Sequence, residues 1–186
     1  ASILIDRGNL KEAELSTRKA IELNPDLAMA YSNLGNILRD LGELEEAELS
    51  TRKAIELNPN FANGYNNLGI IMQDFGRLEE AEKYIRKAIK LKPDFAKAYL
   101  ILGNLLRDFG KTREAQIFIS NAIKLKPKLG DAHSSLGLLF QEQGKDGEAF
   151  SCFLQAIKVS PKDDNNYILM RQFLKDSDLS SIKKNE

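Results

Sequence analysis

The chain has 186 residues, and its 27 basic and 27 acidic side chains cancel to a formal net charge of zero. A balanced charge gives no long-range field toward nucleic acid or an anionic membrane, so the sequence disfavours both as partners. A single cysteine, Cys152, excludes an internal disulfide and fits a reducing compartment, so we expect a cytoplasmic protein. No apolar run approaches the roughly 18–20 residues of a membrane span.

The chain repeats itself at an interval of 34 residues. All five prolines obey this interval, as do two rows of glycine and two rows of alanine. Such self-similarity is typical of a solenoid, in which stacked supersecondary units bury a continuous core. The rows are Pro25, Pro59, Pro93, Pro127 and Pro161; Gly35, Gly69, Gly103 and Gly137; Gly8, Gly42, Gly76, Gly110 and Gly144; Ala13, Ala47, Ala81, Ala115 and Ala149; and Ala20, Ala54, Ala88, Ala122 and Ala156.

Each complete repeat predicts a pair of helices, because apolar residues recur in it twice at helical spacing. Gly42 predicts the end of the first helix, since glycine adopts the left-handed conformation freely. Pro59 predicts the end of the second helix. The row of Gly42 includes Gly8, so we expect the same break in the incomplete first repeat. Taken in order, the partial repeat is 1–27 and the complete repeats are 28–61, 62–95, 96–129 and 130–163.

After residue 163 the pattern holds for one more helix and then fails. Tyr167 occupies the aromatic place of that helix, whereas Lys183 falls where a small alanine would be expected. We therefore expect a capping helix at 164–175, so that residues 1–175 form one array. The remainder, 176–186, is polar and charged and is expected to be a tail or a linker.

One segment occurs twice without change. Residues Glu12–Pro25 and Glu46–Pro59 both read EAELSTRKAIELNP. The identity indicates a recent duplication or a consensus-like design, and both explanations stay open.

The spacing of aromatic, Leu-Gly, Ala, Ala and Pro within each repeat resembles the tetratricopeptide repeat family, and the resemblance covers about residues 1–163. It extends to the arrays of bacterial tetratricopeptide proteins and of O-GlcNAc transferase-type enzymes. It implies an all-α, right-handed superhelical solenoid of antiparallel helix pairs. The residues that carry it in the first complete repeat are Tyr31, Leu34, Gly35, Ala47, Ala54 and Pro59.

The family binds peptide or protein segments in the concave groove lined by the first helices of its repeats, and the resemblance implies the same groove here. Asparagine accumulates at the inward places although it is a poor helix former, and its amide can donate to and accept from a peptide backbone. The alternative, that these are solvated residues inherited by duplication, stays open. The expected binding residues are Asn33, Asn36, Arg39, Asn66, Asn67, Ile70, Lys97, Ile101, Asn104 and Arg107.

Further along, the inward places become apolar, at Ile70, Leu100, Ile101 and Leu138. Aliphatic residues gathered in a concave face usually mark a contact site. Coverage by the capping helix or by the next turn of the superhelix is an equally good explanation.

Two narrower functions follow from the resemblance. Some family members bind the C-terminal carboxylate of chaperone tails in a clamp of three cations and two asparagines. Here Asn36, Asn67 and Lys97 match the clamp, but Ser32 and Ile101 replace two of its three cations. A chaperone tail is therefore disfavoured as the ligand. Inward asparagines also resemble the arrays that precede the catalytic domain of O-GlcNAc transferase. The runner-up function is therefore that of a substrate-recruiting appendage of a larger transferase-type enzyme.

The chain shows no constellation for catalysis, so we expect no enzyme activity, no cofactor and no metal. The lone His133 stands at the aromatic place and has no second ligand to share a metal, and Cys152 is expected to be a packing residue. The row of Asp40, Asp74, Asp108 and Glu142 adjoins two arginines, which favours a charge-balanced ridge over a catalytic dyad. The cut first repeat leaves Ile3, Leu4 and Ile5 at an uncovered edge, which suggests end-to-end self-association.

Overall fold

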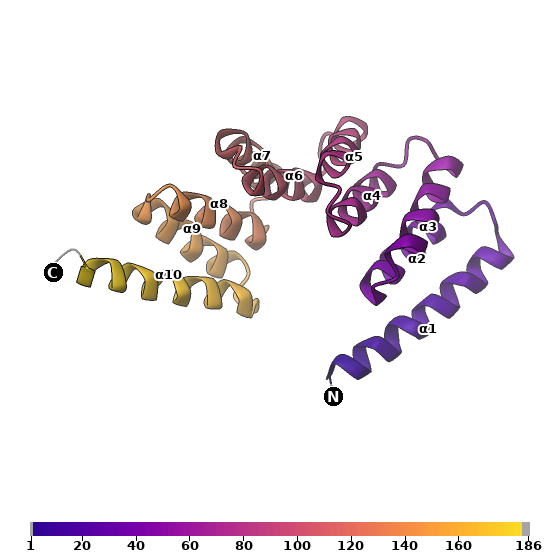
Figure 1. The fold of residues 1–186 in the computed structure, drawn as a ribbon, viewed down its shortest axis with the longest axis horizontal. Coiled ribbons are helices and arrows are strands. Elements are labelled where there is room, and N and C mark those ends of the chain that lie inside the picture. Colours follow the sequence, from indigo (N-terminus) through magenta and orange to yellow (C-terminus); the bar gives the residue numbers. More distant parts are fainter. Residues whose placement is uncertain (1, 184–186) are drawn as a thin grey trace. The chain divides into compact units, whose positions relative to one another are not determined.

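The computed structural model describes the backbone of residues 2–183 and the side chains of residues 8–176. As predicted, this part of the chain is all-helical: ten α-helices follow one another with no strand between them (Figure 1). The helices form two compact units, residues 1–93 and residues 94–186. The division falls next to Pro93, close to the end of a repeat.

In the first unit, one long helix precedes two helix pairs. Within each pair the helices run antiparallel and pack along their length, and the long helix packs on the first pair (Figure 1). The elements are α1 (Ser2–Leu23), α2 (Ala28–Leu41), α3 (Leu44–Leu57), α4 (Ala62–Asp74) and α5 (Leu78–Leu91).

The second unit has the reverse order, with two helix pairs followed by one long helix. The long helix packs against both members of the pair before it. The elements are α6 (Ala96–Asp108), α7 (Thr112–Leu125), α8 (Gly130–Glu142), α9 (Asp146–Val159) and α10 (Asp164–Lys183).

The turn inside each pair depends on a left-handed glycine, as predicted. Gly42 has a φ of 85° and donates its N–H to the carbonyl oxygen of Arg39 at 2.9 Å, and the N–H of Glu43 reaches the carbonyl oxygen of Leu38 at 2.8 Å. These bonds satisfy carbonyl groups that the end of a helix leaves open. The same turn recurs at Gly76, Gly110 and Gly144, with φ of 73°, 71° and 69°.

The small residues at the helix crossings are also confirmed. A Cβ atom added to Gly103 would lie 2.5 Å from Cγ1 of Ile119 and 3.3 Å from the carbonyl oxygen of Ala115. The first and second helices of a pair therefore approach so closely that only glycine fits the crossing. Ala47 of α3 is fully buried at the matching crossing with Gly35, and Ala54 is also fully buried.

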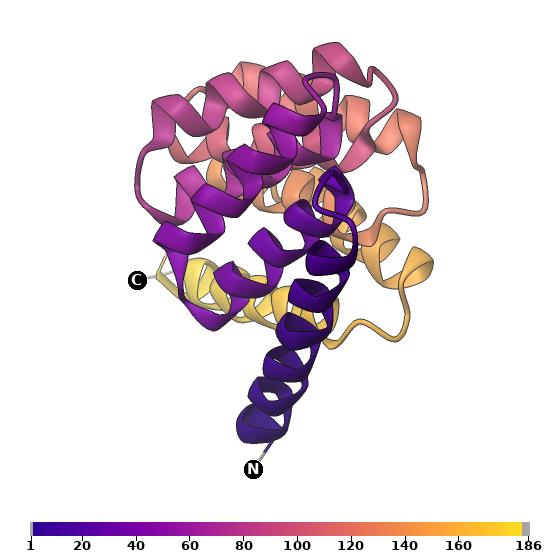
Figure 2. The same cartoon turned by 90° about the vertical axis from the view of Figure 1, so that its right-hand side faces the viewer.

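The break expected at Gly8 is wrong. α1 continues without interruption from Ser2 to Leu23, and Gly8 has no positive φ. Its N-terminal turns extend beyond the other helices of the first unit (Figure 2). Residues 2–7 correspond only to the last places of a first helix and lack the glycine and leucine by which α2 packs on α3. Without that packing, no buried contact would stabilise a turn at Gly8, whereas continuing the helix through one glycine costs only about 1 kcal/mol.

The capping helix is longer than expected. The sequence pattern predicted 164–175, but α10 reaches Lys183, so most of the expected tail is helical. Asp178 occupies the place of the turn glycine, and neither glycine nor proline follows it. Nothing local therefore ends the helix. Residues 184–186 lie outside the described residues.

A buried polar network attaches α10 to the preceding pair. Asn166 is 1% exposed, and its Oδ1 accepts a hydrogen bond from Oγ of Ser134 at 2.7 Å. Its Nδ2 lies 3.4 Å from the carbonyl oxygens of both Ala156 and Ser160 at the end of α9. Arg171 stands at the place of the crossing glycines and is exposed. At the other crossings, glycine at this place leaves room for the second helix of the pair.

Candidate functional site

In the first unit, the candidate surface is the side of α2 and α4 that is turned away from α3 and α5. The opposite sides carry the buried glycines Gly35 and Gly69, against which the second helix of each pair packs. On the free side, Asn33 is exposed and Asn36 is half-buried. No described residue forms a hydrogen bond with either side-chain amide, so both amides are open to donate and to accept.

A third asparagine on this side links the two helices. Nδ2 of Asn67 on α4 donates to Oγ of Ser32 on α2 at 2.9 Å. The bond orients the amide of Asn67 next to the open amides of α2. We call the surface formed by Asn33, Asn36 and Asn67 the amide face; Ser32, which is only 2% exposed, lies beneath it and orients Asn67.

Arg39 lies at the end of the amide face and is held by acidic neighbours. Its guanidinium contacts Asp40 at 2.6 Å and Asp74, on the next first helix, at 3.7 Å. The arginine therefore offers little free positive charge to a ligand, in keeping with the charge-balanced ridge that the sequence predicted. Ile70 is half-buried on α4 and adds an aliphatic contact.

Asn66 is not on the open surface, which corrects the expected set of binding residues. Only 5% of this residue is exposed, and its Oδ1 is buried without a hydrogen-bond partner among the described residues. The repeat pattern assigned it to an inward place, but that place is covered in the folded chain. A ligand lying on the surface has no access to it.

In the second unit, the same side of α6 and α8 is aliphatic. Ile101 and Leu138 are half-buried on these two contacting helices. Leu138 also packs against the buried cluster of α9 and α10, so the capping helix covers it in part. Leu100, which the sequence placed with them, is only 7% exposed. We call Ile101 and Leu138 the aliphatic face.

Polar residues flank the aliphatic face. Lys97 is exposed on α6, and no described residue pairs with it. Arg107 contacts Asp108 at 3.3 Å and Glu142 at 3.6 Å, in the same manner as Arg39 in the first unit. Asn104 is half-buried, and its Oδ1 is buried without a partner among the described residues.

The groups with catalytic potential are engaged in structural contacts. Nε2 of His133 lies 2.9 Å from the carbonyl oxygen of Pro127. Burial raises the pKa of the Cys152 thiol, which disfavours the reactive thiolate form. In the described part of the chain, no three side chains of the metal-binding kinds come together, and no helix is long and apolar enough to cross a membrane.

The sequence analysis did not include Ser32 among the binding residues, although it orients Asn67. A signal for it exists in the repeat itself. Ser134 occupies the same place of its repeat and also bonds to an asparagine of the next first helix, Asn166, although the two asparagines stand at different places of the repeat. The shared signal is therefore the serine, whose hydroxyl links successive first helices in both units.

Comparisons with known proteins agree with this arrangement. Family models described as tetratricopeptide repeat match residues 1–27, 28–61, 51–83, 96–129 and 130–163. No curated protein sequence matches the chain.

Three solved structures are similar over most of their length. The crystal structure of MamA is 25% identical, with a TM-score of 0.69, over 84% of this chain and 92% of that chain. TTC0263, a thermophilic TPR protein of Thermus thermophilus, is 21% identical with a TM-score of 0.80, over 93% and 94% of the two chains. YrrB, described as a TPR protein with an unusual peptide-binding site, is 22% identical with a TM-score of 0.66, over 94% and 88%.

Proposed function

Because this chain belongs to the tetratricopeptide repeat family, we propose that it is a protein-interaction scaffold that binds an extended peptide segment on the amide face. The open amides of Asn33 and Asn36 carry this proposal. They are three positions apart on one helix, which places them side by side. Each offers a donor and an acceptor to a peptide backbone, so the face would hold an extended chain with little dependence on its side chains.

The proposed ligand contacts are polar rather than ionic. Arg39 is paired with Asp40 and Asp74 and adds no net attraction. Ligand binding should therefore depend weakly on salt, which distinguishes it from a carboxylate clamp. Asn67, held by Ser32, supplies the contact from α4.

In the second unit, we propose that the aliphatic face binds apolar side chains of a ligand segment. Ile101 provides the accessible contact on α6, with Lys97 exposed on the same helix. Ile101→Ser should weaken ligands that have aliphatic side chains and leave purely polar ligands unaffected. Equal loss for both kinds of ligand would mean that Ile101 only supports the fold.

The test uses peptides selected from a random library on the full chain. Asn33→Ala combined with Asn36→Ala should lower the affinity of selected peptides about tenfold, while Asn9→Ala combined with Asn60→Ala, which changes two exposed asparagines outside both proposed binding surfaces, should not. N-methylation of single backbone amides in the peptide should cause a comparable loss at two or more positions. Unchanged affinity in the Asn33 and Asn36 variant would refute the proposal.

Three further properties stay predictions. We propose a cytoplasmic location, where the free thiol of Cys152 remains reduced.

The runner-up function, recruitment of substrates to an attached transferase-type enzyme, would use the same amide face, and the coding sequence beyond Glu186 would identify such an enzyme. End-to-end association depends on Ile3, Leu4 and Ile5, whose side chains lie outside the described residues; sedimentation at high concentration tests it.

A further inference from the structure

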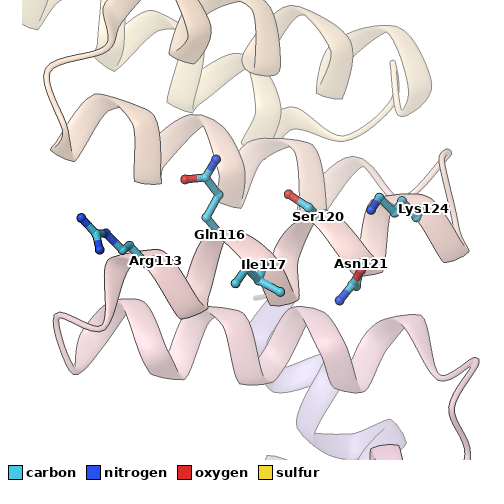
Figure 3. Close-up of a pocket in the computed structure, with 6 residues that line it drawn as sticks. All are labelled: Arg113, Gln116, Ile117, Ser120, Asn121 and Lys124. Carbon is cyan, nitrogen blue, oxygen red and sulfur yellow. The ribbon is translucent and has the colours of Figure 1, made fainter.

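A hollow of about 380 Å³ lies along one side of α7 and shares no lining residue with the aliphatic face. Its lining side chains follow the helix over three turns, with a cation at each end and an isoleucine between them (Figure 3). Ile117 is 59% exposed, which is high for an aliphatic residue. The lining residues, which we call the α7 strip, are Arg113, Gln116, Ile117, Ser120, Asn121 and Lys124.

The hollow arises where a ladder of ion pairs stops. At the places of Gln116 and Ser120, the three earlier second helices carry a glutamate and an arginine that pair along the helix. The pairs are Glu14 with Arg18 at 3.0 Å, Glu48 with Arg52 at 2.7 Å, and Glu82 with Arg86 at 2.8 Å.

In the first unit, these pairs also connect successive second helices. Arg18 contacts Glu46 at 2.8 Å, and Arg77 contacts Glu48 at 3.1 Å. Long charged side chains thus fill the space between the helices. Gln116 and Ser120 are neutral and cannot form such links, so the corresponding space beside α7 is open.

Two cations on this side of α7 have no carboxylate partner among the described residues. Neither Arg113 nor Lys124 pairs with a carboxylate of any described residue, and both are exposed. They are eleven positions apart, which corresponds to roughly 16 Å along a helix. No acidic residue belongs to the α7 strip. The strip is therefore a local positive surface with an aliphatic centre in a chain of zero net charge.

We propose that the α7 strip docks an acidic protein segment in extended conformation, with one carboxylate near Arg113, another near Lys124 and an aliphatic side chain over Ile117. Residues in an extended chain are about 3.3 Å apart, so carboxylates five residues apart span the required distance. Charge complementarity favours an acidic partner, and an extended protein segment can offer two carboxylates and an aliphatic side chain together, which nucleic acid cannot. The proposal is independent of the function assigned to the amide face.

The first test uses the full chain and a labelled hexapeptide, Glu-Ser-Leu-Ser-Ser-Glu, with blocked termini. Fluorescence anisotropy at 20–50 mM salt, roughly the range in which charges act over more than 10 Å, should show binding that disappears at about 0.5 M salt. A peptide with glutamine in place of both glutamates should not bind. Absence of binding at low salt, or binding that is insensitive to salt, would overturn the proposal.

Charge reversal locates the site. Arg113→Glu combined with Lys124→Glu should lower the affinity at least tenfold, and the milder Arg113→Gln with Lys124→Gln should lower it severalfold. The matched control is Lys83→Glu with Lys90→Glu, which makes the same change of net charge on exposed lysines of α5. An equal loss in the control would show a nonspecific charge effect and would refute the α7 strip as the site.

The aliphatic centre has its own matched control. Leu49 occupies the place of Ile117 on α3 and is 68% exposed, but it lies among the ion pairs of Glu48 and Arg52. Ile117→Ser should lower the peptide's affinity about threefold, and Leu49→Ser should leave it unchanged. If both variants bind as the parent does, the aliphatic contact is absent and the proposal of an acidic segment anchored on Ile117 fails.

Discussion

Two helices of the first unit, α1 and α3, contain the first twelve residues of the same fourteen-residue segment in different surroundings. In α3, Ala47, Thr51 and Ala54 are fully buried. Their counterparts in α1 are Ala13, Thr17 and Ala20, and all three are only half-buried. The sequences are identical, so the difference in burial comes entirely from the neighbouring helices.

The neighbour that differs is the first helix of the pair. α2 packs on α3 so closely that a Cβ atom at Gly35 would lie 3.1 Å from the carbonyl oxygen of Ala47. In the described part of the chain, no helix precedes α1 in that position. The comparison teaches that the small residues of this repeat are required only where a first helix covers them.

The largest effect expected from this comparison is overpacking at the crossing. Ala47→Leu should lower the free energy of unfolding by about 1–3 kcal/mol, because α2 leaves no space for three more carbon atoms. Ala13→Leu, at the matching place of α1, should change it by less than about 0.5 kcal/mol. Urea denaturation followed by the helical circular dichroism signal measures both. Equal losses would mean that α1 is covered as closely as α3.

A smaller effect of opposite sign is expected at the threonines. Oγ1 of Thr51 is buried without a hydrogen-bond partner among the described residues, whereas the Thr17 hydroxyl donates to the carbonyl oxygen of Ala13 at 2.7 Å. Replacing an unsatisfied buried hydroxyl by a methyl group removes a desolvation cost, so Thr51→Val should stabilise the chain by about 1 kcal/mol.

Thr17→Val serves as the control for that substitution. It removes a satisfied hydrogen bond at a half-buried place, so it should be neutral or slightly destabilising. The two melting temperatures, measured side by side, test the comparison. A gain from Thr17→Val equal to that from Thr51→Val would indicate an effect of valine itself rather than of the buried hydroxyl.

The smallest effect concerns an ion pair of α1. The carboxylate of Glu14 accepts hydrogen bonds from Nζ of Lys11 at 3.1 Å and from Nε of Arg18 at 3.0 Å, and these two cations lower the pKa of Glu14. A lowered pKa in the folded chain means that the stabilisation is present above the ordinary pKa of glutamate and is lost as the pH falls through the lowered value.

Glu14→Gln should therefore cost a few tenths of a kcal/mol at pH 7, as is usual for exposed pairs. The cost should shrink as the pH falls below the ordinary pKa of glutamate, about 4.3. Urea denaturation of parent and variant across this range measures it. A cost that stays constant with pH would show that Glu14 acts by packing rather than by charge.

Much of the fold follows from local sequence signals. The turns at Gly42 and its counterparts were predicted correctly because a left-handed residue ends a helix through its own backbone. The crossing at Gly35 was predicted because a missing side chain has a single packing explanation when it recurs in every repeat. The local signal failed at Gly8, where the outcome depended on a partner helix, and the end predicted at Lys175 was wrong because no glycine or proline follows there to end α10.

The candidate site was predicted less completely than the fold. The repeat pattern assigned Asn66 and Leu100 to the open side, but both are buried. An inward place in the pattern specifies a direction from the helix axis and not the distance to the next helix. The pattern also gave no indication of the hollow beside α7, which results from changes at Gln116 and Ser120 relative to the other repeats.

The sequence by itself determined the helix pairs, their period and the glycine turns, because each depends on backbone preferences and apolar spacing within one repeat. Only the tertiary structure decided which copies of the same residue are buried, which amides are open and which cations are unpaired. Those properties depend on what the neighbouring helix places within a few ångströms. The identical segments Glu12–Pro25 and Glu46–Pro59 therefore both form helices, but their matching residues differ in exposure.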